Sequence, residues 1–232
     1  MKNNKFKQKL TQTIIHLKKK KKILLITTSN RWVGDKEDPK STLLAKKIAQ
    51  QLNEKTTLLD VAKIKIYPCE GNVSTSKGNS CGEKSALLND PEKNPSRNHR
   101  CWASINNPDD ELWKVSKALF ESDTVIFFAS IRWGQTNSIY QKLLERLTWI
   151  ENMHSTFGEE NKVKKIEAGI IATGQNWNGK KVIRTQKEVL KYFGFKVNEK
   201  LCWNWQYTTN TSDETNESYK KSWKKFNKTF FE

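Results

Sequence analysis

The chain has little of what marks a membrane-bound or secreted protein. In its 232 residues, no uninterrupted apolar run approaches the roughly 20 residues that a membrane-spanning helix needs. The basic N-terminus is followed only by the apolar run at residues 23–26, which is too short for a secretory signal. Four widely spaced cysteines in a chain of this length do not form the pattern of a disulfide framework. We therefore expect a cytoplasmic protein with reduced thiols.

Two nucleotide-binding sequence motifs are also missing. No G-x-G-x-x-G follows the first apolar run, and G-x-x-x-x-G-K-[ST] occurs nowhere in the chain. The first absence removes support for a dinucleotide-binding Rossmann site. The second removes support for a nucleoside triphosphatase of the P-loop type. Any phosphate group must therefore be held by another arrangement of residues.

Positive charge is abundant but unevenly distributed. Of the net charge of +17, nine units come from lysines among residues 1–22, which contain no acidic residue, so the remainder carries +8. Within this basic N-terminal extension, Phe6, Leu10, Ile14 and Leu17 fall on one face of a helix. Such a helix could lie on an anionic membrane or bind nucleic acid. It could also cover the sheet or contact a second subunit, and we favour this second interpretation.

Apolar runs and helical patterns alternate along residues 23–232, which we treat as one domain. The runs predict five strands, at residues 23–28, 57–61, 124–128, 168–172 and 201–203. The alternation predicts an α/β fold with a doubly wound parallel sheet of five strands in the order 2-1-3-4-5. Residues 62–106 interrupt it as a long irregular insertion, which we expect to cover an active site. After the insertion, Asn107 is expected to cap a helix.

Three polar loops follow the first, third and fourth predicted strands, at residues 29–31, 130–136 and 173–177. Ligands bind at the carboxyl ends of the strands in such sheets. With the helix start at Ser41 and Thr42, the first loop predicts a phosphate cradle of hydroxyls, an arginine and free amides. The alternative is that Ser41 only caps its helix and Arg31 is a solvated charge. Trp133, in the second loop, is either a stacking face for a flat ring or an ordinary buried aromatic residue.

These loops resemble those of the flavodoxin-like NAD(P)H-dependent FMN reductases and NAD(P)H:quinone oxidoreductases. The resemblance covers about residues 23–195, and the loop between Arg31 and Ser41 is longer here than is usual in that group. The residues that carry it are Ser29-Asn30-Arg31 with Ser41-Thr42, Tyr67-Pro68-Cys69 leading to Asp109-Asp110, Ser130-Ile131-Arg132-Trp133-Gly134, and Ala172-Thr173-Gly174.

The resemblance implies a flavodoxin-like fold with FMN bound at the three loops. The residues that would contact the FMN phosphate are Ser29, Arg31, Ser41 and Thr42. Those that would line the isoalloxazine ring and the ribityl chain are Ser130, Ile131, Arg132, Trp133, Gly134 and Gln135. Thr173 and Gly174 would close over the ring.

The resemblance also implies an FMN-dependent oxidoreductase that takes a hydride from NAD(P)H and passes it, through flavin N5, to a quinone, a flavin or a similar small acceptor. Such a transfer needs no protein acid or base, so we expect no catalytic side chain. The alternative is a flavodoxin-type FMN electron carrier without pyridine-nucleotide activity, although carriers usually dock through acidic surfaces and this chain is basic. The resemblance further implies a homo-oligomer. Binding of nucleic acid or an anionic membrane by the lysine-rich segment is the weakest alternative.

The cysteines of the insertion do not predict a metal centre. Some proteins of this group carry an iron–sulfur cluster on C-x2-C-x2-C, but Asn72 and Thr75 occupy the positions that would follow Cys69. A zinc site that includes His99 would lack the paired C-x2-C spacing. We therefore expect no metal site and interpret these cysteines as reduced thiols.

Overall fold

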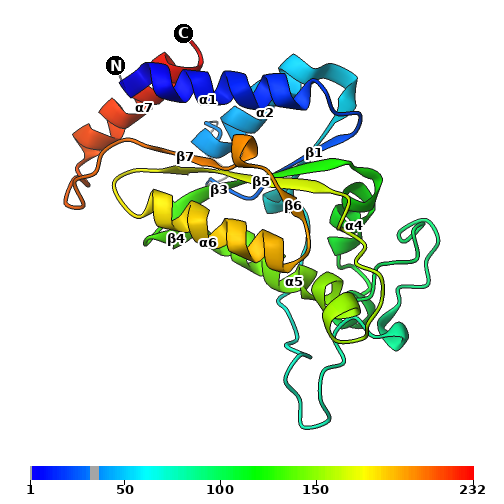
Figure 1. Cartoon of the computed structure of the whole chain (residues 1–232). Helices are drawn as coiled ribbons and strands as arrows, with labels where there is room; N and C mark the ends of the chain where they lie inside the picture. Colours follow the sequence, from blue (N-terminus) through cyan, green and yellow to red (C-terminus); the bar gives the residue numbers. More distant parts are fainter. Residues whose placement is uncertain (1, 32–36) are drawn as a thin grey trace.

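A parallel sheet with helices on both faces forms the centre of the protein (Figure 1). The computed structural model describes residues 2–31 and 37–232, so most of the long loop after Arg31 lies outside the described residues. The sheet order is β2-β1-β3-β5-β6, which confirms the predicted order 2-1-3-4-5. The strands are β1 (Ile23–Thr27), β2 (Thr56–Asp60), β3 (Thr124–Arg132), β5 (Glu167–Gly174) and β6 (Lys196–Val197).

The fifth strand of the sheet is divided into two short segments. β6 pairs with the start of β5, and β7 (Trp203–Gln206) pairs with its end. Between them lies a 3-10 turn, η4 (Glu199–Leu201). Leu201 packs on Gly169 so closely that a β-carbon on the glycine would lie 2.2 Å from that of the leucine. The strand predicted at residues 201–203 was therefore placed too early, because its first residues belong to this break.

Side chains of the strands divide the core into two layers, because successive residues of a strand point to opposite faces. In β1, Ile23 and Leu25 are buried in one layer, and Leu24 and Ile26 in the other. Strands that are buried on both faces are apolar throughout, which explains why short apolar runs predicted them. The first layer is covered by α1 (Lys2–Leu17), α2 (Lys40–Leu52) and α7 (Asn216–Phe230), and the second by α4 (Leu112–Glu121), α5 (Ser138–Ser155) and α6 (Gly179–Tyr192) (Figure 1).

The lysine-rich N-terminal segment forms α1 and packs against the sheet. Leu10, Ile14 and Leu17 are buried in the layer that α1 shares with α2 and α7. The hydroxyl of Thr13 accepts a hydrogen bond of 3.0 Å from the indole Nε1 of Trp203. The apolar face of α1 is therefore used inside the protein. In the described part of the chain, no helix has both the length and the apolar character that a membrane crossing needs.

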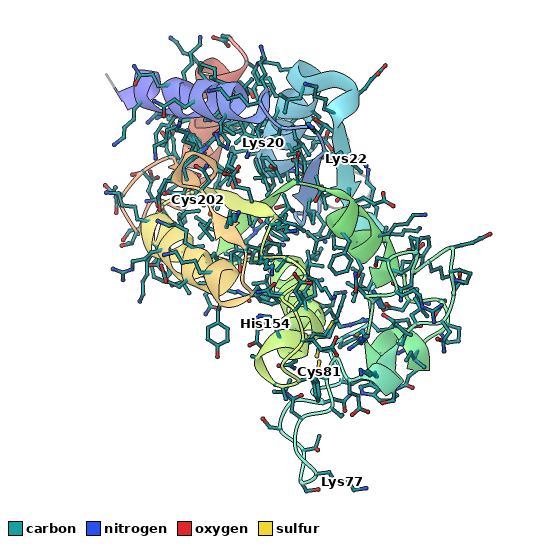
Figure 2. The ribbon with its side chains drawn as sticks, turned by 45° about the vertical axis from the view of Figure 1, so that its right-hand side comes forward. Lys20, Lys22, Lys77, Cys81, His154 and Cys202 are labelled. Atoms are coloured by element: carbon teal, nitrogen blue, oxygen red, sulfur yellow. The ribbon has the colours of Figure 1, made fainter. Side chains whose placement is uncertain are left out.

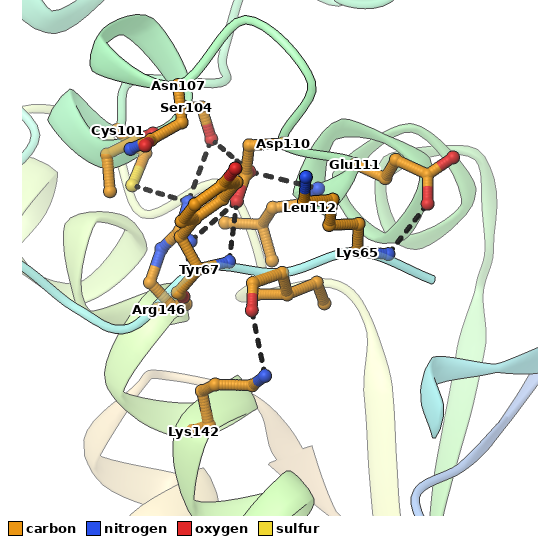
Figure 3. Close-up of polar contacts among 12 residues, drawn as sticks. Lys65, Tyr67, Cys101, Ser104, Asn107, Asp110, Glu111, Leu112, Lys142 and Arg146 are labelled. Carbon is orange, nitrogen blue, oxygen red and sulfur yellow. Dashed lines mark hydrogen bonds and ion pairs between the residues drawn. The ribbon is translucent and has the colours of Figure 1, made fainter. Parts of the chain in front are cut away.

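One buried arginine holds the insertion between β2 and α4 to the rest of the protein. Arg146 of α5 is 1% exposed, and its guanidinium donates to the two carboxylate oxygens of Asp110 at 2.8 and 3.0 Å (Figure 3). It also donates to the Ser104 hydroxyl at 3.0 Å and to the Tyr67 carbonyl at 2.7 Å. Burial raises the pKa of Asp110, but the hydrogen bonds from Arg146, the Tyr67 amide and Ser104, together with the charge of Arg146, hold that pKa below its ordinary value. The irregular insertion is thus ordered around a buried charge pair.

Asn107 does not cap α4, contrary to the sequence-based prediction. The helix begins at Leu112, whose amide donates to the Asp110 carboxylate at 3.1 Å. The Asn107 side chain instead donates to the carbonyl of Ala103 at 2.8 Å, at the end of the short helix α3 (Trp102–Asn106). The acidic residue beside the helix start is also the partner of the buried arginine. A tertiary contact therefore decides where α4 begins.

The four cysteines are free thiols, and three of them, Cys69, Cys81 and Cys101, belong to the insertion. Figure 2 shows Cys81 in the insertion and Cys202 beside the sheet. Burial raises the pKa of Cys81 to about 12 and that of Cys202 to about 11, so both thiols stay protonated at neutral pH. Among the described residues, no three His, Cys, Asp or Glu side chains converge as metal ligands.

A buried histidine of the insertion is expected to make stability depend on pH. The ring nitrogens of His99 lie 2.7 Å from the Ser116 hydroxyl and 2.9 Å from the Ser104 hydroxyl. Burial, with a smaller effect of Arg146, lowers the pKa of His99 to about 4. An unfolded histidine has a pKa of about 6.5, so below that pH the unfolded chain binds a proton that the folded chain does not. The free energy of unfolding should therefore fall by about 2 kcal/mol between pH 7 and pH 5.

Urea unfolding at the two pH values measures this dependence. The variant His99→Gln can still form hydrogen bonds but cannot titrate, so it should lose less stability over the same interval. An equal loss in both proteins would show that another group is responsible.

Candidate functional site

The carboxyl ends of β1, β3 and β5 open into one cleft with a volume of about 580 Å³. Ser41 and Thr42 lie behind its wall, buried in the first turn of α2, and Gln135 is exposed on β4 (Gln135–Thr136) outside the lining. The predicted site residues that do line the cleft are Ser29, Arg31, Ser130, Ile131, Arg132, Trp133, Gly134, Thr173 and Gly174. Three loops that are distant in the sequence therefore meet at one edge of the sheet, as the order of the strands requires.

The second of these loops is a β-hairpin rather than an irregular loop. β3 continues beyond the predicted strand to Arg132 and turns back into β4, with Arg132 opposite Gln135. The two turn residues, Trp133 and Gly134, have φ angles of +48° and +70°. Positive φ at both positions is the geometry of a type I′ hairpin turn. Trp133 is 88% exposed at the tip of this hairpin, so it is not an ordinary buried aromatic residue.

The hairpin tip is held against the loop that follows β5. A β-carbon on Gly134 would lie 2.9 Å from the ring of Trp177 and 2.9 Å from the side-chain amide nitrogen of Asn178. Asn178 itself has a φ of +62° and donates a hydrogen bond to the Gly134 carbonyl. The absence of a side chain at Gly134 thus allows two walls of the cleft to come together.

Asn137, which sequence reasoning missed, connects the first two walls. It is 7% exposed, and its side-chain oxygen accepts from the amide of Ser130 at 3.1 Å. Its side-chain nitrogen donates to the carbonyl of Thr28 at 2.7 Å. Asn137 precedes the first residue of α5, a position where sequence analysis expects only a helix cap, but its side chain forms no cap. It instead fixes the end of β1 relative to the end of β3.

The end of the cleft beside α2 carries hydroxyl groups and positive charge. The hydroxyl of Ser41 donates to that of Ser29 at 2.8 Å, so it reaches the loop after β1. The Thr42 hydroxyl is buried and has no hydrogen-bond partner in the described structure. Arg31 is exposed there, 4.0 Å from a carboxylate oxygen of Glu37. With the N-terminus of α2, these groups favour a negatively charged ligand.

The C-terminal segment forms a further wall that sequence reasoning did not predict. It contributes both aromatic and charged groups, from just before α7 and from the first half of α7. Lys40, the first residue of α2, lines the cleft next to this wall and donates a hydrogen bond to Ser222 of α7. This wall was missed because the sequence resemblance ends near residue 195, before these residues. The cleft residues from this segment are Glu214, Tyr219, Lys220 and Trp223.

No known family profile matches the chain, and no curated protein matches its sequence. The structure resembles that of RosB with the bound intermediate 8-demethyl-8-formylriboflavin-5'-phosphate, with a TM-score of 0.56 and 18% identity over 90% of this chain and 73% of RosB. It also resembles azoreductase AzrA, with a TM-score of 0.51, and the azoreductase from Bacillus anthracis str. Sterne, with a TM-score of 0.50. Both are 10% identical to this chain, and each match covers 90% of it and 96% of the azoreductase.

These likenesses establish the fold. The chain has the flavodoxin-like fold that the resemblance of its loops to FMN reductases and quinone reductases implied.

Proposed function

We propose that this protein binds FMN in the cleft and is an oxidoreductase that takes a hydride from NAD(P)H and delivers it to a small acceptor such as a quinone or a flavin. The observation that carries the proposal is the convergence, in one cleft, of a positively charged end, an aromatic hairpin tip and several backbone turns. A flavin phosphate is also the molecule bound in the structure of RosB.

The residues of the cleft fit the parts of such a cofactor. The phosphate would lie beside Ser29 and Arg31, near the start of α2, whose positive end favours an anion. The ring would lie between the hairpin at Trp133 and the loop after Thr173, which exclude water from its faces. The bound flavin would supply the hydride chemistry, and the protein would supply binding, orientation and electrostatics. No side chain has to move a proton for the hydride to pass.

A flavodoxin-type electron carrier is the second candidate, but two observations favour the enzyme. The chain carries a net charge of +17, whereas carriers commonly dock through acidic surfaces. The wall formed by α7 also covers one side of the cleft, where a carrier needs an accessible ring edge. We further infer a homo-oligomer, which the exposure of Trp133 supports and which light scattering of the purified protein tests. The four free thiols support a reducing, cytoplasmic setting.

Absorption spectroscopy and flavin titration test the proposal. Purified protein should show the two visible bands of a flavin, or acquire them when the protein freed of flavin is titrated with FMN. Oxidation of NADH or NADPH that accelerates when a quinone is added identifies the enzyme. FMN binding without such oxidation identifies the carrier. Colourless protein that does not bind added FMN would overturn both.

The hairpin arginine should be needed for tight FMN binding. Arg132 lines the cleft, and the loss of one charge-assisted hydrogen bond weakens binding about tenfold. Arg132→Ala should therefore raise the dissociation constant of FMN by about that factor, measured by quenching of flavin fluorescence. Arg184→Ala on the exposed face of α6 is the matched control and should leave the constant unchanged. Equal FMN binding by both variants would remove Arg132 from the site.

A further inference from the structure

The C-terminal helix holds one cation of α2 at the positively charged end of the cleft. Lys40 lines the cleft, and its ammonium nitrogen donates to the Ser222 hydroxyl of α7 at 3.1 Å. The same nitrogen lies 4.9 Å from the ring centre of Trp223 and 5.6 Å from that of Trp205 in β7. The described structure gives Lys40 no carboxylate partner within ion-pair distance. Its charge is thus held in place without being neutralised.

Aromatic packing makes this arrangement well defined. Phe226, which is fully buried, contacts Trp205 at a ring-centre distance of 5.2 Å and stacks on Trp223 at 5.9 Å. The two tryptophans on either side of Lys40 are therefore fixed by one core residue of α7. The hydroxyl of Ser222 is also fully buried. Lys40 consequently has little freedom to turn away from the cleft.

The charges around Lys40 leave an excess of positive potential. Arg31, from the loop after β1, has its guanidinium carbon 5.5 Å from the ring centre of Trp223, the same ring that Lys40 approaches. Burial, followed by the repulsion of Arg31, lowers the pKa of Lys40 to about 8, and Glu37 opposes this only in part. The other charged or titratable groups that line the cleft from the C-terminal segment are Glu214, Tyr219 and Lys220.

We propose that Lys40, positioned by Ser222, Trp223 and Trp205, is a further ligand of the phosphate of bound FMN, which makes the C-terminal helix part of the cofactor site. The inference rests on the proposed FMN binding. A phosphate dianion beside Lys40 would pair with its ammonium group and keep that group protonated. The uncharged cofactor analogue riboflavin, which lacks the phosphate, gains nothing from this contact.

A comparison of FMN with riboflavin tests the proposal. Dissociation constants of both flavins are measured by fluorescence quenching at pH 7 for the wild type, Lys40→Met and Lys47→Met. The last variant removes the same charge from the same helix at a position that contacts Phe231 rather than the cleft. Lys40→Met should weaken FMN binding about tenfold or more and leave riboflavin binding unchanged. Lys47→Met should change neither constant.

The pH dependence provides a second readout that a purely structural role would not affect. In the wild type, the preference for FMN over riboflavin should decrease between pH 8 and pH 9.5, because binding then requires Lys40 to take up a proton. The phosphate stays dianionic over this range. Lys40→Arg keeps a charge that does not titrate, so it should retain the preference and lose this pH dependence.

Three outcomes would contradict the roles proposed for Lys40 and the cleft. Unchanged FMN binding by Lys40→Met would show that Lys40 is not a phosphate ligand. Equal weakening of FMN and riboflavin would show that the lysine only supports the cleft. A wild type that binds neither flavin would overturn the proposed function itself, independently of Lys40.

Discussion

Replacing Arg146 by methionine is expected to lower the free energy of unfolding by about 3–5 kcal/mol. The variant fills a similar volume but leaves Asp110, which is 3% exposed, as a buried carboxylate without its two guanidinium hydrogen bonds. The carbonyl of Tyr67 and the hydroxyl of Ser104 lose the same donor. Urea unfolding followed by tryptophan fluorescence measures the loss. Since this contact holds the insertion, residues 62–106 should also become more sensitive to proteolysis.

Two further variants distinguish the buried charge pair from a general effect on α5. Lys142→Met removes a cation of the same helix that donates a hydrogen bond of 2.8 Å to the Ile66 carbonyl (Figure 3). This variant should lower the free energy of unfolding by less than about 1 kcal/mol. The double variant Arg146→Met with Asp110→Leu leaves no unpaired buried charge and should recover much of the stability. A loss below about 1 kcal/mol in the single arginine variant would contradict the structural role of the pair.

Substituting alanine for Gly134 is expected to weaken FMN binding about tenfold or more while the protein remains folded. Its φ of +70° costs a residue with a β-carbon about 1–2 kcal/mol, and that carbon would also lie 2.9 Å from Trp177 and Asn178. The hairpin can relieve this crowding only by moving away from the loop after β5. The backbone that lines the cleft would move with it. Fluorescence titration gives the affinity, and thermal unfolding gives the stability.

Gly158→Ala is the matched control for this change. Gly158 has a φ of +66°, but nothing lies within 4 Å of the β-carbon that alanine would add. Gly158→Ala therefore carries the conformational penalty without the crowding. This variant should lose a similar amount of folding stability but keep the FMN affinity of the wild type. If the two variants bind FMN equally well, the contact between hairpin and loop is not needed for the site.

The strand ends illustrate what local patterns could predict. Residues 124–128 form a run of β-branched and aromatic residues, and such a run is buried wherever a parallel sheet has helices on both faces. Strands that alternate with helices favour a parallel sheet, and in such a sheet the loops after the strands meet at one edge. The positions of Ser29, Arg31 and the residues after Ala129 in one cleft follow from these two rules. The predicted site therefore needed no knowledge of side-chain contacts.

The details that prediction missed depend on contacts between distant residues. The strand predicted at residues 201–203 failed because Leu201 packs on Gly169, and the cap predicted at Asn107 failed because Arg146 requires Asp110 nearby. The hairpin after β3 was interpreted as a loop because its returning strand, β4, is only two residues long. Local propensity is a weak signal in each case, and tertiary packing overrides it.

From its order of apolar runs and polar loops alone, the chain already specifies the class of fold and the edge of the sheet that carries the cleft, because strand burial and parallel connectivity are properties of local pattern. Tertiary structure alone decides how that cleft is completed. Asn137 bonds to Thr28 across 109 positions, and Lys40 bonds to Ser222 across 182. Contacts over such separations form only when helices and strands pack together, so no local pattern of residues can encode them.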